Sequence, residues 1–81
     1  MFKVGKVTHY YDKIGVAIVD LDGTISVNDR VKFVKGGKEL FEQEVESIQI
    51  EHEKVDSAGR GNVIGLKTNE VVEEGVEVFK I

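Results

Sequence analysis

The chain has 81 residues, of which 41% are hydrophobic and 32% are charged, and it contains no cysteine. This composition predicts one globular domain over residues 1–81 and excludes disulfides and thiolate zinc sites. The longest apolar stretch, Ile14 to Val19, is far shorter than the roughly 18–20 residues that span a bilayer. Because no secretory signal is visible either, we expect a cytoplasmic protein with no membrane partner.

The net charge is −4, and it is unevenly distributed, with +2 on residues 1–40 and −6 on residues 41–81. An acidic chain is a poor candidate for non-specific nucleic-acid binding, which depends on neutralising phosphates. Any contact with RNA therefore needs a local basic face, and the best candidate is formed by Lys32, Lys35 and Lys38. The alternative interpretation is a solvated edge strand protected by its charges.

Six runs rich in β-branched and aromatic residues follow one another, separated by turn signals. In chain order they cover residues 3–11, 15–21, 30–35, 40–53, 62–68 and 76–81. Asp22-Gly23 and Gly36-Gly37 are dipeptides favoured where both central residues of a hairpin turn take positive φ. The only competing helical pattern, residues 38–48, continues into a β-rich run without a stop signal. The spacing predicts an all-β sandwich or barrel.

Two of these runs depart from simple alternation. The run at 15–21 is apolar on both faces, which predicts a central strand or one covered by a neighbouring hairpin. In the run at 40–53, Val45 lies on one face, whereas Ile48 and Ile50 take the opposite phase. A slip of one residue at Ser47–Ile48 predicts a β-bulge, which lets a long strand bend around a small barrel.

The polar residues form no readable catalytic constellation. His9 and His52 are the only histidines, and nothing in the sequence places them beside Asp12, Glu51 or Glu53. We therefore expect no catalytic residues, no metal site, no cofactor and no enzymatic activity. Phe2, Tyr10 and Tyr11 are expected to pack in the core or at the end of the barrel rather than to stack on bases.

The loop Gly59-Arg60-Gly61-Asn62 is the most promising binding feature of the sequence. Its two glycines allow close backbone approach, and the guanidinium of Arg60 can pair with a phosphate or a carboxylate. The alternative is a tight turn that carries an exposed arginine.

Several motifs, taken in order, resemble the second domain of translation elongation factors. The stretches "VESIQIEHE" and "AGRGNVIGL" resemble V-x-S-I-x-M-H-H-E and the A-x-P-G-D-N loop followed by V-G-L. "ISVNDRV" is similar to a turn with the form G-D-x-V, and its Asn28 tolerates the positive φ that such a turn needs. The chain is most similar to small stand-alone elongation factor-like proteins, and similar barrels also end some collagenase-like peptidases.

The resemblance implies a small closed antiparallel β-barrel of six to seven strands. It does not imply GTPase activity, because the chain lacks a G-x-x-x-x-G-K-[ST] loop. Arg60 and Val63 stand where the tRNA-delivering relatives have other residues, so aminoacyl recognition does not carry over.

The expected function is a non-enzymatic module that contacts RNA or a ribosome-associated complex. The expected contact residues are Gly59, Arg60, Gly61, Asn62, Lys32, Lys35 and Lys38. The alternative is a protein-interaction adaptor that docks on a partner enzyme such as a collagenase-like peptidase.

Overall fold

The computed structural model describes residues 2–81, so Met1, the first residue of the expected domain, lies outside the described residues. Its regular elements are ten strands: β1 (Phe2–Tyr11), β2 (Val16–Leu21), β3 (Ile25–Ser26), β4 (Arg30–Lys35), β5 (Lys38–Glu44), β6 (Ile48–Ile50), β7 (Glu53–Val55), β8 (Ser57–Ala58), β9 (Val63–Lys67) and β10 (Glu77–Lys80). Residues 2–81 contain no helix, and hence none that could cross a membrane. The expected all-β antiparallel architecture is confirmed.

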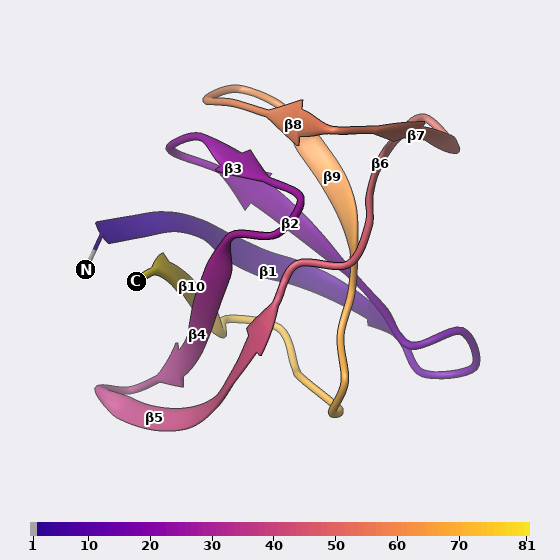
Figure 1. Ribbon diagram of the computed structural model, residues 1–81. Coiled ribbons are helices and arrows are strands. Elements are labelled where there is room, and N and C mark those ends of the chain that lie inside the picture. Colours follow the sequence, from indigo (N-terminus) through magenta and orange to yellow (C-terminus); the bar gives the residue numbers. More distant parts are fainter. Residues whose placement is uncertain (1) are drawn as a thin grey trace.

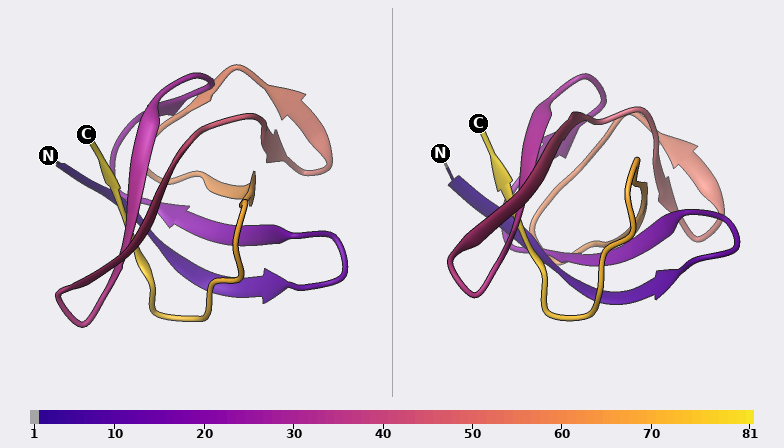
Figure 2. Two further views of the ribbon diagram at one scale, coloured as in Figure 1. Left: turned by 60° about the horizontal axis from the view of Figure 1, so that its bottom comes forward. Right: turned by 90° about the horizontal axis from the view of Figure 1, so that it is seen from below.

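Eight strands form one strongly curved sheet, in the order β5-β4-β10-β1-β2-β9-β6-β7, and every pair is antiparallel. Strands β3 and β8 form a separate two-stranded ribbon. Figure 1 shows this ribbon beside β2 and β9, with the β4–β5 hairpin at the far end of the molecule. The views in Figure 2 show that the strands curl around a common centre.

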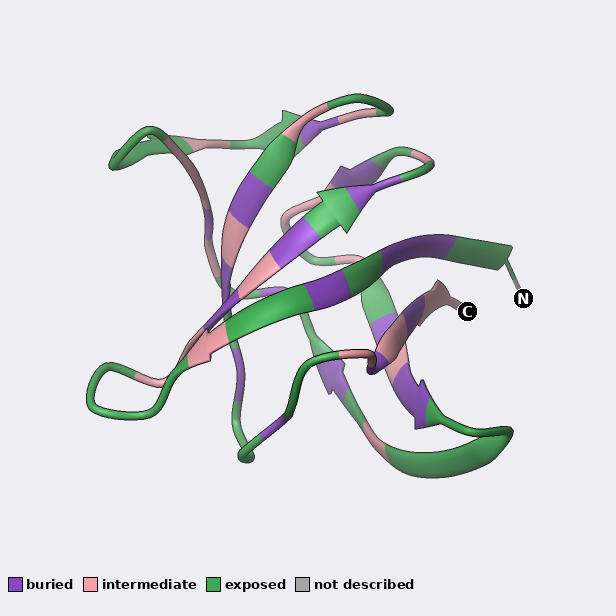
Figure 3. Cartoon of the chain, turned by 180° about the vertical axis from the view of Figure 1, so that it is seen from behind, coloured by how far each residue is buried: buried purple, intermediate pink, exposed green. Residues whose placement is uncertain are grey.

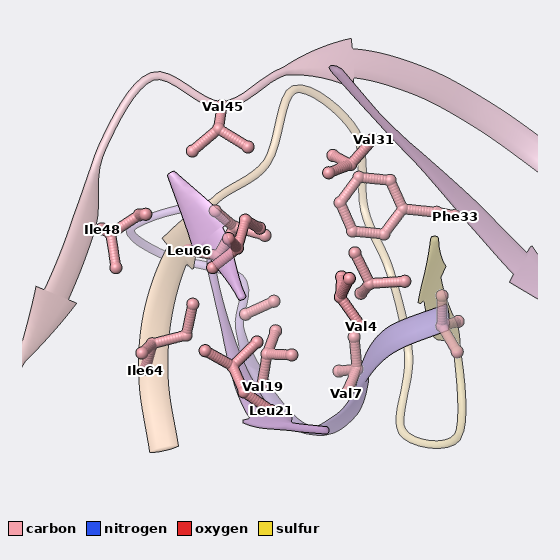
Figure 4. Packing of buried hydrophobic residues seen from close by; sticks show 14 of the residues in the cluster. Val4, Val7, Val19, Leu21, Val31, Phe33, Val45, Ile48, Ile64 and Leu66 are labelled. Atoms are coloured by element: carbon pink, nitrogen blue, oxygen red, sulfur yellow. The ribbon is translucent and has the colours of Figure 1, made fainter. Parts of the chain in front are cut away.

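The core fills the inside of this curl. Alternation along β2 turns Ala17, Val19 and Leu21 inward, and all three are buried. Figure 3 shows the same alternation of buried and exposed residues along several strands, and in Figure 4 the labelled apolar side chains gather around one centre. Phe33 on β4 is fully buried and stacks on Phe41 of β5, with ring centroids 4.5 Å apart. Burying a side chain of this size contributes about 1.5–3 kcal/mol.

Close contact between β1 and β2 requires a glycine at position 5. A Cβ added to Gly5 would lie 2.6 Å from Val19 Cγ1 and 2.9 Å from the carbonyl oxygen of Asp20. The pairing of β1 with β10 is irregular between Lys3 and Gly5, where the strand bends. Gly5 therefore lets β1 bend tightly against β2, and this bend contributes to the curl of the sheet.

A side chain of β5 bonds to the end of β9 and to the segment that follows it. Gln43 of β5 is only 2% exposed, and its Nε2 donates to the carbonyl oxygen of Lys67 at 2.8 Å. Its Oε1 accepts from the backbone N–H of Asn69 at 2.7 Å. The buried amide thus fastens β5 to the segment that follows β9, and both ends of the amide have partners.

The structure corrects the expectation of a closed barrel of six to seven strands. The sheet has two ends, β5 and β7, and no backbone ladder joins them. The chain leaves the sheet after Glu44, and the backbone of Val45 bonds instead to Asp29 and Asn28 in the loop before β4. The sheet therefore curls without closing.

The expected β-bulge at Ser47–Ile48 is also wrong, because the run at 40–53 is not one strand. β5 ends at Glu44 and pairs with β4, whereas β6 begins at Ile48 and pairs with β9 and β7. Val45, which follows β5, and Ile48, which begins β6, are both fully buried. The change of face in the sequence marks a transfer between two parts of the sheet.

The turn predictions had mixed outcomes. Gly36 and Gly37 both have positive φ, at 57° and 80°, and Asn28 has φ of 78°, as predicted. Asp22 and Gly23 do not have positive φ, so the predicted tight turn there is wrong. Their backbone N–H groups instead both donate to the carbonyl oxygen of Val4, while the chain continues into β3.

We predict that Gly5→Ala destabilises the fold by about 1–3 kcal/mol, because the added methyl group overlaps Val19 and the backbone of β2. Urea denaturation measures the change. Gly59→Ala is the control, since a Cβ at position 59 would meet only Thr24 Oγ1, at 3.8 Å. Equal stabilities of the two variants would contradict the role given to Gly5.

We predict that Gln43→Leu lowers the free energy of unfolding by about 1–3 kcal/mol, because the N–H of Asn69 and the carbonyl of Lys67 lose their partner. Gln49→Leu is the matched control, since within residues 2–81 the side chain of Gln49 makes no hydrogen bond. Should Gln43→Leu be as stable as the parent, the bridge does not hold the sheet together.

Candidate functional site

The predicted contact loop is a hydrogen-bonded turn between β8 and β9. The N–H of Asn62 donates to the carbonyl oxygen of Gly59 at 3.0 Å, and the N–H of Gly59 donates to Asn62 Oδ1, also at 3.0 Å. Gly61 has φ of 90°, which matches the third position of a type II turn. Arg60 is exposed at the tip. The turn presents one arginine on a fixed backbone, as the alternative interpretation expected.

The predicted lysine face, defined by Lys32, Lys35 and Lys38, carries its own counter-charges. Lys32 Nζ lies 2.8 Å from Glu39 Oε1 and 3.8 Å from Glu42 Oε2. Lys35 Nζ lies 2.7 Å from Glu73 Oε1. The hydrogen bond that Lys32 donates to Glu39, together with the charges of Glu39 and Glu42, raises the pKa of Lys32 despite partial desolvation. These pairs reduce the positive field that the face can offer to an anion.

The arginine turn and the lysine face do not form one site. Figure 1 shows the β8–β9 connection and the β4–β5 hairpin at opposite ends of the molecule, and Figure 2 agrees. The structure therefore separates the two sets of predicted contact residues. Their role in binding a partner stays a prediction.

A different feature, which the sequence did not indicate as a site, lies on the outer face of the sheet. It is a groove of about 370 Å³ beside the β1–β2 hairpin, and we call it the hairpin groove. It is lined by Tyr11, Ile14, Val16, Ile18, Gln49, Glu51, His52, Val63, Ile64 and Gly65. Volumes from about 300 Å³ upward are typical of ligand sites.

The groove is apolar because β2 carries apolar side chains on both faces. While Ala17 and Val19 point into the core, Val16 and Ile18 form the outer floor and are half-buried. Gly65 of β9 continues this floor without a side chain. The two-sided pattern at 15–21, which predicts a central or covered strand, is the signal that could have revealed this surface. β2 is central in the sheet, as predicted, but no hairpin covers its outer face in the described residues.

Exposed apolar side chains form the walls of the groove. Ile14 is 59% exposed, Val63 is 55% exposed and Tyr11 is 49% exposed. Tyr11 also meets His9 edge to face, with ring centroids 4.5 Å apart. Neighbouring apolar side chains exposed around a concave floor are typical of interaction surfaces. Tyr11 therefore lies outside the core, on the wall of the groove.

The polar rim of the groove includes a strained turn. Glu51 and His52 connect β6 to β7, and both have positive φ, at 51° and 68°. A two-residue turn of this geometry favours Asn-Gly or Gly-Gly, and each other residue held there costs of order 1 kcal/mol. The sequence did not reveal this turn, since residues 51–52 carry neither glycine nor asparagine.

The hairpin groove combines polar and apolar side chains that can contact a ligand. Its rim places a carboxylate, an imidazole and the amide of Gln49 around an apolar floor. Within residues 2–81, no group of three or more His, Cys, Asp or Glu side chains is arranged to hold a metal ion. The arrangement suits a ligand with apolar side chains and a few polar contacts.

Comparison with known proteins places the chain beside peptidases. No family model matches it. An uncharacterized protease of Methanocaldococcus jannaschii is 31% identical over 77 residues, which cover 95% of this chain and 19% of that protein. The chain therefore spans about a fifth of the length of this relative.

Two crystal structures of the C-terminal domain of a candidate U32 peptidase from Geobacillus thermoleovorans share the fold, with TM-scores of 0.91 and 0.90 at 23% identity. The similarity covers 99% of this chain in both cases, and 100% and 92% of the respective domains.

These relatives overturn the expected relationship to translation elongation factors. The chain is similar to a protease, not to an elongation factor, and the contact with RNA or ribosomes that rested on that relationship loses its support. The motifs misled because "VESIQIEHE" and "AGRGNVIGL" encode a transfer between strands and a tight turn. Any small, strongly curved sheet needs such features. The alternative expectation of a domain that accompanies a peptidase agrees with these relatives.

We predict that Glu39→Gln lowers the pKa of Lys32, because the hydrogen bond that Lys32 donates to the Glu39 carboxylate is the main cause that raises it. An NMR titration of the lysine side chain measures the change, with Glu46→Gln as an exposed control. A raised lysine pKa stabilises the fold below its unfolded value of about 10.4, and this contribution is lost as pH rises through the folded pKa. The variant should therefore be less stable than the parent near neutral pH, with the difference vanishing at strongly alkaline pH.

Proposed function

We propose that this chain is a docking domain that works with a peptidase-type catalytic protein, either within one polypeptide or as a separate subunit. The observation that carries the proposal is the 31% identity to a protease over nearly the whole chain. Because the matched region is about a fifth of that protein, the remainder has room for a separate catalytic domain. The occurrence of the same fold as a C-terminal domain in a candidate U32 peptidase supports this division.

The contribution of this chain is binding. Among the hollows on residues 2–81, the hairpin groove has the most apolar lining, and the carboxylates and histidines of these residues form no cluster that could hold a metal. A docking domain of this kind holds a polypeptide or orients the catalytic part towards it. Proximity of this sort raises the rate of a reaction carried out elsewhere on the same assembly.

Domain replacement in the Methanocaldococcus protease tests the proposal. One form lacks the region that matches this chain, and a second carries residues 2–81 of this chain in its place. Hydrolysis of a fluorescently labelled, denatured casein is measured for both forms and for the intact protease. We expect deletion to reduce hydrolysis and replacement to restore a substantial part of it.

A control tests whether the folded state of the domain is what restores hydrolysis. The replacement is repeated with Gly5→Ala, which loosens the domain without touching its outer face. Partial loss of hydrolysis in this variant supports the view that the folded domain is what restores activity. The replacement form could be folded and soluble and yet hydrolyse no more casein than the deletion form. This result would show that the two domains differ in function.

A further inference from the structure

The end of the hairpin groove at Tyr11 and Ile14 lies far from the chain termini. β1 begins beside them at Phe2 and runs ten residues to Tyr11, about 30 Å of extended chain, while the longest dimension of the molecule is 31 Å. Figure 1 shows both termini on one side and the β1–β2 hairpin on the other, and Figure 2 agrees. A catalytic domain joined at either terminus would meet the opposite end first, which leaves the groove accessible to another molecule.

The dimensions of the groove suit a short extended segment. On β9 the lining runs from Val63 to Gly65, and on β2 it begins at Val16, the register partner of Lys67. The floor thus covers the length of β9 from Val63 to Lys67, five residues or about 13 Å. Val16 and Ile18 of β2 lie directly across from Lys67 and Gly65. Four or five residues of extended polypeptide match this length, with alternate side chains directed at the floor. A folded partner would need a flatter and larger surface.

The charges at the two ends of the groove differ. At the Val63 end lie Glu51, in the lining, and Asp20, the register partner of Val63. Within residues 2–81 neither carboxylate is in an ion pair; the pairs gather on β1, β4, β5 and β10 and the loops beside them. At the other end Lys67 Nζ donates to the carbonyl oxygen of Ile14 at 3.1 Å. The free carboxylates favour a basic group at the Val63 end.

Other titratable groups also face this region, among them Tyr11 in the lining of the groove. Lys6 on β1 is the register partner of Asp20, and His9 is the partner of Ile18. His52 lies beside Glu51 in the turn. Since Lys6 is opposite Asp20, the carboxylate of Glu51 is the better acceptor for a cation from outside. It lines the groove, whereas Asp20 does not.

We infer that the hairpin groove binds an extended polypeptide segment whose apolar side chains rest on Val16, Ile18 and Gly65 and whose basic side chain pairs with Glu51. The choice of a polypeptide rests on the proposed function, because a partner of a peptidase handles polypeptide chains. The apolar floor supplies affinity, and the carboxylate fixes the direction of the bound segment.

The strained turn at Glu51-His52 supports this assignment. A turn needed only to join β6 and β7 would be more stable with glycine or asparagine at these two positions. The residues present instead place a carboxylate and an imidazole at the rim of the groove. Strain retained at a ligand-facing position points to a role in binding.

The test uses the full chain, labelled with ¹⁵N, and three acetylated pentapeptide amides. The first is Leu-Thr-Leu-Thr-Arg, the second has glutamate in place of arginine, and the third has serine in place of both leucines. We expect the arginyl peptide to shift the amide signals of Ile18, Val63 and Gly65, the glutamyl peptide to bind more weakly, and the seryl peptide to have no effect. No shifts at millimolar arginyl peptide, or shifts confined to other surfaces, would overturn the inference.

Variants then test the two parts of the groove. Ile14→Ser and Glu51→Gln should each weaken binding of the arginyl peptide, the latter by about two- to fivefold, as expected for an exposed ion pair. Val71→Ser and Glu70→Gln are matched controls, since Val71 is 75% exposed and both residues lie outside the groove. Equal effects of groove and control variants would overturn the inference.

A combined change separates binding from turn structure. Glu51→Asn with His52→Gly supplies the preferred turn residues, so we expect higher thermal stability together with weaker peptide binding. Higher stability with unchanged binding would mean that these residues serve only the turn. Gly36→Asn alters another turn of this kind far from the groove and should leave binding unchanged.

The outcomes distinguish this inference from the proposed function. If the protease that carries residues 2–81 of this chain is active but the chain binds no peptide, the assignment of the groove fails and the docking function stands. If the peptide binds but replacement restores no hydrolysis, the proposed function fails. Signals in the groove that change with protein concentration alone would identify a second copy of the chain as the occupant and overturn the inference.

Discussion

The buried amide of Gln43 is the contact on which the rest of the structure depends. Backbone ladders join eight strands in a row but leave β5 and β7 unpaired with each other. The side chain of Gln43 spans part of this opening, because it both donates to Lys67 and accepts from Asn69. A buried amide with both ends satisfied costs little, whereas an unsatisfied one is expensive. The interaction therefore fixes how far the sheet curls and keeps the thin core enclosed.

The curl also explains why the outer face of the sheet carries a groove. A strongly bent sheet directs its inner side chains to one centre, where Val19, Phe33 and Leu66 are fully buried. Its outer face is concave only where neighbouring segments rise above the floor. The β1–β2 hairpin and the Glu51-His52 turn do so on either side of β2 and β9. The same strand, β2, therefore serves both the core and the outer surface.

The resemblance to translation factors failed for a physical reason. The matching residues bend strands, transfer the chain between strands, or form turns, as Val45, Ile48 and Gly61 do here. Such residues report the geometry of a small curved sheet and carry little information about a ligand. The side chains that a ligand would meet are exposed ones such as Tyr11, Ile14 and Val63. The sequence pattern gives these residues no distinctive period.

The sequence by itself determined the strand content, most strand positions and the turn at Gly36-Gly37, because alternation and glycine preferences are local properties. It also showed that the strand at 15–21 is apolar on both faces. Only the tertiary structure decided that residues 40–53 divide between two strands, that the sheet stays open, and that Glu51 and His52 form a turn at the rim of a groove. Each of these depends on pairing between residues far apart in the chain, and no local preference specifies such pairing.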